Sequence, residues 1–182
     1  MNGLELASDG EDSHIVVAED ALVLPNGARA VFALNIDPEI NGGVEPFYAY
    51  SGLRLSNEAD RLEISADGAR LDEVSWDDGE TMPDPSGSSM SLDPMYITAT
   101  DNDDPAYWCA SDQAWGSTTD WGSPGQENNP CPQFDHDGDG LSDGLELGLA
   151  AAQTEDTSLS IFVADPAPAS RTNPYKTDTD GD

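Results

Sequence analysis

The sequence has few positive charges. Its 182 residues include 6 Lys and Arg against 37 Asp and Glu, which gives a formal net charge of −31. Proteins that bind nucleic acid neutralise phosphates with Lys and Arg, so this composition excludes binding through a broad basic surface. The same charge repels anionic membrane surfaces. Its partners are therefore expected elsewhere, among proteins or components of a cell envelope.

Long apolar runs are also missing. No segment approaches the ~20 apolar residues of a membrane-spanning helix, and the chain does not begin with a signal peptide. Hydrophobic residues still make up 37% of the sequence, with four Trp, five Tyr and four Phe. That is enough for a modest core, so the composition indicates about one folded domain followed by a tail.

Sustained helical periodicity is absent before residue 140. Short apolar segments instead alternate with turn signals every ~8–12 residues, a spacing typical of antiparallel β-sandwiches. Asp67 and Gly68 separate the clearest pair of segments, 61–65 and 70–76, and predict a β-hairpin because both residues tolerate positive φ. Residues 25–27 predict a similar turn between 21–24 and the β-rich run 29–34, and weaker strand candidates are 4–6, 14–17, 47–50, 53–55 and 90–92.

The C-terminal third has a different composition. Segment 122–132 is rich in Pro and Gly and predicts a loop. Residues 142 to about 153 predict one short helix, which Gly144 and Gly148 weaken by about 1 kcal/mol each. In the polar tail that follows, 159–163 is a candidate strand.

Cysteine is scarce. Cys109 and Cys131 do not form a C-x-x-C pattern, and His14 and His136 are not spaced to complete a zinc site with them. A thiol nucleophile would need a base, and none can be identified. We therefore predict a disulfide between the two, which would close a loop and indicate an oxidising compartment.

Residues 135–146 carry carboxylates at regular intervals. They read DHDGDGLSDGLE and fit the twelve-position calcium loop, with Asp at positions 1, 3, 5 and 9, Gly at 6 and Glu at 12. Ca²⁺ prefers roughly six to eight oxygens near 2.4 Å, whereas Mg²⁺ tends to keep its water. The alternative is a solvated acidic turn. The predicted ligands are Asp135, Asp137, Asp139, the carbonyl of Leu141, Asp143 and Glu146.

The calcium loop resembles bacterial repeats of the thrombospondin type 3 class. Pro130 and Pro132 exclude the entering helix of a helix–loop–helix hand. Residues 173–182 resemble the start of a second copy that stops before its Gly and closing Glu, so this incomplete site is expected to bind weakly. Its predicted ligands are Asp178, Asp180 and Asp182.

The first 131 residues resemble the bacterial lamin-tail domain. The resemblance depends on the order and spacing of short motifs at 2–6, 24–31, 41–44, 55–64, 72–76, 83–92, 101–103, 108–109 and 122–128. It implies an immunoglobulin-like antiparallel β-sandwich over residues 1–131, followed by an acidic calcium-binding region over residues 132–182. The initial W-x-E-[IL]-x-N strand of that family is missing, so we expect a fragment open at both ends.

Other residues allow competing interpretations. Ser88, Ser89 and Ser91 have no identifiable His partner, and no catalytic or organic-cofactor residues are predicted. Trp115 and Trp121 lie among Gly, Ser and Thr and could form a contact patch, which keeps a carbohydrate-binding or hydrolase-associated module open as an alternative. A third interpretation is that the acidity serves only solubility in salt.

Together these patterns predict a non-catalytic, extracellular or cell-surface module. It would combine an all-β sandwich, whose role in adhesion or docking is what the resemblance implies, with a Ca²⁺-stiffened spacer, within a larger protein. Bound Ca²⁺ would neutralise part of the acidic tail and convert a self-repelling segment into a rigid one.

Overall fold

A computed structural model describes residues 1–10, 12–116, 120–151 and 164–177. Within these residues it contains eight strands, two single-turn 3-10 helices and one short α-helix. The predicted β-rich fold is confirmed at this level. The described residues contain no helix with the length and apolar character needed to cross a membrane.

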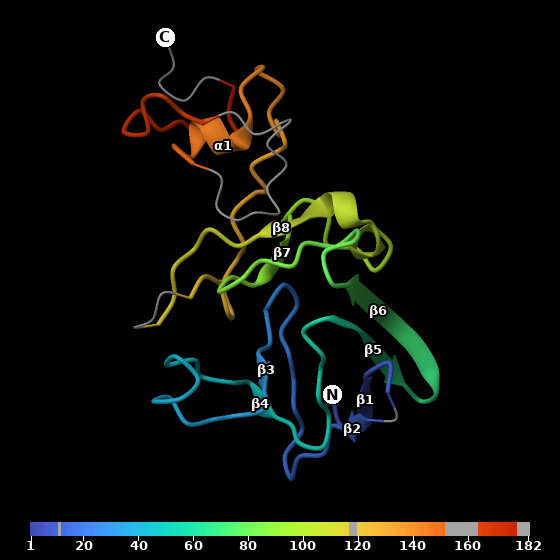
Figure 1. The fold of residues 1–182 in the computed structure, drawn as a ribbon. Helices are drawn as coiled ribbons and strands as arrows, with labels where there is room; N and C mark the ends of the chain where they lie inside the picture. Colours follow the sequence, from blue (N-terminus) through green and yellow to red (C-terminus); the bar gives the residue numbers. More distant parts are fainter. Residues whose placement is uncertain (11, 117–119, 152–163, 178–182) are drawn as a thin grey trace.

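The largest sheet has four strands in the order β2-β1-β5-β6, all antiparallel. Its longest element is the hairpin of β5 and β6, visible in green in Figure 1, in which β5 is an inner strand and β6 an edge strand. At its tip Asp67 and Gly68 have φ values of 52° and 74°, which is the left-handed conformation that the sequence predicted for this turn. The strands are β1 (Leu4–Ala7), β2 (Ser13–Ile15), β5 (Ala59–Ala66) and β6 (Ala69–Asp77).

Two small sheets complete the strand pairing. β3 (Phe32–Ala33) and β4 (Tyr48–Ala49) pair in parallel, and β7 (Met90–Leu92) pairs antiparallel with β8 (Trp108–Ala110). In Figure 1 the β7–β8 pair lies between the four-stranded sheet and the C-terminal segment. The predicted strands 21–24 and 53–55 were wrong, because an apolar run becomes a strand only where a neighbouring strand pairs with it.

The apolar core is small. The buried hydrophobic residues among those described are Leu6, Val16, Leu53, Met82 and Cys131. Hydrogen bonds from turns to carboxylates supplement this packing. Asp77 accepts the hydroxyl of Thr81 at 2.6 Å and the backbone N–H groups of Thr81 and Met82, and these bonds lower the pKa of its carboxyl. Many of the short carboxylates thus stabilise loops.

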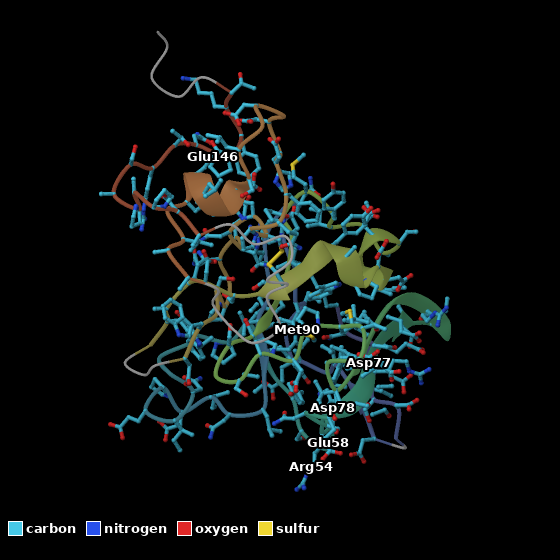
Figure 2. All side chains as sticks on the ribbon, turned by 45° about the horizontal axis from the view of Figure 1, so that its top comes forward. Arg54, Glu58, Asp77, Asp78, Met90 and Glu146 are labelled. Carbon is cyan, nitrogen blue, oxygen red and sulfur yellow. A yellow bond between two sulfur atoms is a disulfide. The ribbon has the colours of Figure 1, made fainter. Side chains whose placement is uncertain are left out.

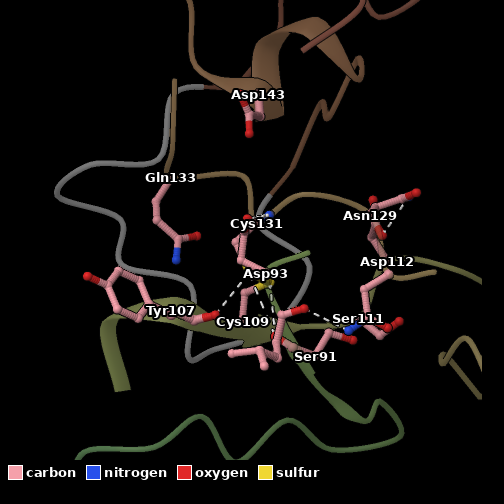
Figure 3. The surroundings of a disulfide bond; sticks show 12 residues. Ser91, Asp93, Tyr107, Cys109, Ser111, Asp112, Asn129, Cys131, Gln133 and Asp143 are labelled. Carbon is pink, nitrogen blue, oxygen red and sulfur yellow. Dashed lines mark hydrogen bonds between the residues drawn. A yellow bond between two sulfur atoms is a disulfide. The ribbon is translucent and has the colours of Figure 1, made fainter. Parts of the chain in front are cut away.

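The predicted disulfide is present. It joins Cys109 on β8 to Cys131, 22 residues later, and Cys131 is fully buried (Figure 3). The backbone N–H of Cys131 donates to Asp93 Oδ2 at 2.8 Å. Since Asp93 directly follows β7, the disulfide and this hydrogen bond both attach the start of the acidic region to the β7–β8 pair.

The α-helix is shorter than predicted. α1 spans Asp143–Glu146, and the predicted extension to about residue 153 was wrong. Gly148 adopts a φ of +76°, which ends the helix, and a Cβ at this position would lie 2.5 Å from the carbonyl oxygen of Pro168. The candidate strand 159–163 lies outside the described residues.

Removing the disulfide should destabilise the protein substantially. For the double variant Cys109→Ser/Cys131→Ser we expect the free energy of unfolding to fall by about 3 kcal/mol, because a loop of this length is no longer closed in the unfolded chain. Urea denaturation measures the loss. Reductant should destabilise the parent protein and leave the double variant unchanged. A loss below about 1 kcal/mol would show that the bond adds little to stability.

Candidate metal centre

Three of the predicted calcium ligands converge. Asp135, Asp137 and Asp139 each place a carboxylate oxygen within 4.8 Å of the others. The loop that carries them begins just after the buried disulfide and leads into α1. The alternating spacing read from the sequence therefore produces a cluster of three negative charges, two of them on exposed residues and one on a half-buried residue.

Local hydrogen bonds explain why the backbone turns so tightly here. Asp135 accepts the N–H of Gly138 at 2.8 Å and that of Gly140 at 3.1 Å. Asp137 and Asp139 each accept the N–H two residues later. Gly140, the residue at position 6, has a φ of +94°, which side chains rarely permit. The turn thus follows from short-range residue types.

Glu146 is the residue that most strongly indicates a cation-binding site. It is 2% exposed, and its Oε1 accepts the hydroxyl of Thr172 at 2.9 Å. Its Oε2 is buried without a hydrogen-bond partner among the described residues, and so is Oδ2 of Asp137. An unsatisfied buried acceptor costs about 1–3 kcal/mol, more for a charged group. A cation between the loop and α1 would satisfy both.

Electrostatics places Glu146 beside the loop carboxylates. Burial raises the pKa of its carboxyl, and the charges of Asp137, Asp139 and Asp143 raise it further. The four carboxylates therefore repel one another in the metal-free protein. A divalent cation would remove this repulsion, and an all-oxygen donor set is the one that Ca²⁺ prefers.

Asp143 has a different environment from the one its sequence position suggests. It is fully buried, and its Oδ1 accepts the backbone N–H of His136 at 3.1 Å while its Oδ2 contacts His136 Nδ1. The structure groups Asp143 with His136 and Asp93 and does not include it among the three converging aspartates. Position 9 of such loops often binds through water, so this placement is compatible with the predicted loop.

The group of Asp93, His136 and Asp143 is a hydrogen-bonded clamp. His136 Nε2 lies 3.1 Å from Asp93 Oδ1, so the imidazole stands between the two carboxylates. The two ring nitrogens point in diverging directions, and a single ion could not replace both contacts. The clamp instead joins the loop to β7, because Asp93 also accepts the N–H groups of Met95 and Cys131.

Aromatic packing strengthens the same junction. Tyr96 and Tyr107 stack with ring centroids 3.8 Å apart, and Phe134 and His136 lie against this pair. Tyr175, from the C-terminal segment, packs against His136 with the two ring centroids 5.5 Å apart. Burial, followed by the charges of Asp93, Asp143 and Glu127, raises the pKa of Tyr175 to about 12.

The remaining predicted ligands are only partly placed. Leu141 is exposed, and its N–H donates to Asp139 Oδ1 at 2.8 Å. Its carbonyl oxygen stays a predicted ligand. Asp178, Asp180 and Asp182 lie outside the described residues. Sequence reasoning missed Asp93, His136 and Thr172, because nothing local marks residues whose partners are 26 to 43 positions away.

Comparison with protein-family models, curated proteins and solved structures found no match to this chain. The lamin-tail and thrombospondin type 3 resemblances are therefore sequence-based expectations.

Replacing the buried carboxylate should stabilise the calcium-free protein. We expect Glu146→Gln to raise the stability of the calcium-free protein by about 1 kcal/mol, because it removes a desolvated charge. Since folding raises the pKa of Glu146, protonation of this carboxyl favours the folded state, so its contribution to the stability of the parent protein should rise as pH falls from 7 through the folded-state pKa and the advantage of the variant should shrink. Urea denaturation from pH 7 to pH 4 measures this.

The matched control is Glu19→Gln, which removes the same charge from an exposed position. It should leave the stability and its pH dependence close to those of the parent. Equal effects of the two substitutions would contradict the assigned role of Glu146.

Proposed function

We propose that this chain is a non-catalytic calcium-binding module. The observation that carries the proposal is the combination of three converging aspartates with the buried, unpartnered oxygens of Glu146 and Asp137. A solvated acidic turn has no reason to bury a glutamate opposite three other carboxylates, since burial without a partner is costly. Oxygen-only ligation favours Ca²⁺ over transition metals.

Binding would order more than the loop. Glu146 contacts Thr172 twice, because its Oε1 accepts the Thr172 hydroxyl and its backbone carbonyl accepts the Thr172 N–H at 3.0 Å. A cation that holds Glu146 would therefore also stabilise the 164–177 segment. In this way the binding free energy becomes folding free energy, and the acidic region serves as a Ca²⁺-stiffened spacer.

The setting of the module belongs to the same proposal. The disulfide favours an oxidising compartment, and extracellular calcium sites fill at ~10⁻⁴–10⁻³ M. We place the protein outside the cell or on its surface, within a larger polypeptide. The β-rich residues 1–131 would form the lamin-tail-like, immunoglobulin-like sandwich, with adhesion to or docking on a protein or cell-envelope partner as its role.

A carbohydrate-binding or hydrolase-associated module is the second candidate. Trp121 favours it, because its side chain is 39% exposed and could stack on a sugar ring. Trp115 offers less, since it packs against Gly42, where an added Cβ would lie 2.7 Å from its ring. Glycan binding that is lost in Trp121→Ala would support this candidate.

Calcium should stabilise the full chain measurably. With the metal added up to ~10 mM we expect a higher melting temperature and a change in the far-UV circular dichroism, both reversed by chelator. Mg²⁺ at the same concentration should have a much smaller effect. No response at ~10 mM would refute the calcium site.

Two substitutions of equal charge locate the effect. Asp139→Asn should raise the calcium concentration needed for half of the stabilisation at least about tenfold. Asp20→Asn, at an exposed position outside the loop, should leave that concentration unchanged. If NaCl stabilises all three proteins equally and Ca²⁺ adds nothing, the acidity serves salt-dependent solubility.

A further inference from the structure

A second feature lies far from the metal centre. It is a groove bordered by the 55–58 segment, the turn after β6 and the 83–90 segment. Figure 2 shows its labelled members Glu58 and Asp78 at the opposite end of the molecule from Glu146. The lining combines the three tryptophans Trp76, Trp115 and Trp121 with the four acidic residues Glu58, Asp78, Asp84 and Asp120, and includes no Lys, Arg or His.

Hydrogen bonds hold two of the tryptophans at the groove. The backbone N–H of Trp121 donates to the carbonyl of Gly87 at 3.0 Å, and its backbone carbonyl accepts the N–H of Ser89 at 2.9 Å. Trp76 donates its indole N–H to the carbonyl of Ser56 at 2.8 Å. These bonds fix the backbone position of Trp121 and the indole ring of Trp76, so a ligand would have less of the groove to order on binding.

Three of the four groove carboxylates differ from the neighbouring Asp77 in having no hydrogen bond or ion pair within the described part of the chain. Both carboxylate oxygens of Asp77 accept hydrogen bonds from Thr81 or Met82, as described above. The adjacent Asp78, by contrast, has no ion pair or hydrogen bond to its carboxylate within the described part of the chain, and neither have Glu58 and Asp84. Asp84 lies beside the same turn, 3.4 Å from where a Cβ of Gly79 would be. Unpaired carboxylates and indole rings that line the same groove provide both elements of a cation site.

We propose that this groove binds an arginine- or lysine-bearing segment of a partner protein. A guanidinium or ammonium group can lie over an indole face while it pairs with a nearby carboxylate, and the net charge of −31 attracts such a segment from a distance. A neutral sugar would use the indole rings and leave the carboxylates without a partner. The groove thereby identifies the class of partner that the docking role requires, and it rests on that part of the proposed function.

The test uses a short peptide of three arginines separated by glycines and the full chain. Binding should be measurable by titration calorimetry and should shift the tryptophan fluorescence. We expect Trp121→Ala to weaken binding about fivefold, which corresponds to one exposed cation–π contact. Glu58→Gln/Asp84→Asn should weaken it by about the same factor, and it keeps the groove testable if Trp121→Ala does not fold.

Matched controls separate the groove from general attraction. Glu19→Gln/Asp20→Asn makes the same change in charge at exposed positions outside the groove and should change the affinity less than about twofold. Equal weakening by both charge pairs would overturn the proposal, because the peptide would then follow net charge alone. Binding of a neutral oligosaccharide that needs Trp121 but not the two carboxylates would overturn it in favour of a glycan site.

Performing the titrations with Ca²⁺ and with chelator keeps the two proposals distinguishable. A peptide that fails to bind in either condition refutes the groove and leaves the calcium response unaffected. A missing calcium response with normal peptide binding refutes only the metal centre.

Discussion

Carboxylate repulsion is the constraint on which the rest of this structure depends. With 37 acidic residues and 6 basic ones, few carboxylates can be neutralised by ion pairs. The chain instead satisfies them with N–H and O–H donors in its own turns. Asp60 accepts the N–H groups of Asp9, Ser56 and Arg61, and Asp77 and Asp135 accept comparable local donors. Acidic turns therefore stabilise this protein where a larger apolar core would stabilise another.

The exceptions to this pattern carry the functional argument. Glu146 and Asp137 retain buried oxygens without partners, which a divalent cation would satisfy. Asp78 and Asp84 retain unpaired carboxylates beside tryptophan, which a cationic side chain would satisfy. Neither site has a positive charge of its own, but the two differ in shape: in the first, three carboxylates converge beside the buried Glu146, and the second is an open groove. The difference explains why an ion suits the first and a peptide the second.

Much of the β structure was predictable because it depends on neighbours in the sequence. The hairpin followed from two residues that accept positive φ, and β7 formed at the residues expected. The loop from Asp135 to Leu141 followed from Asp and Gly spacing for the same reason, since its hydrogen bonds span two to five residues. The predicted strand 53–55, with which no strand pairs, was wrong, and so was the length of α1, which ends where Gly148 approaches Pro168.

The sequence by itself determined the acidic composition, the disulfide partners, the hairpin and the converging aspartates, because these depend on residue type and short spacing. Only the tertiary structure decided that Asp143 turns to His136, that Asp93 completes the clamp from 43 residues away, and that Thr172 caps Glu146. The groove of three tryptophans is equally a product of folding. Contacts of this kind form only when packing brings remote segments together, and no local pattern of residues encodes them.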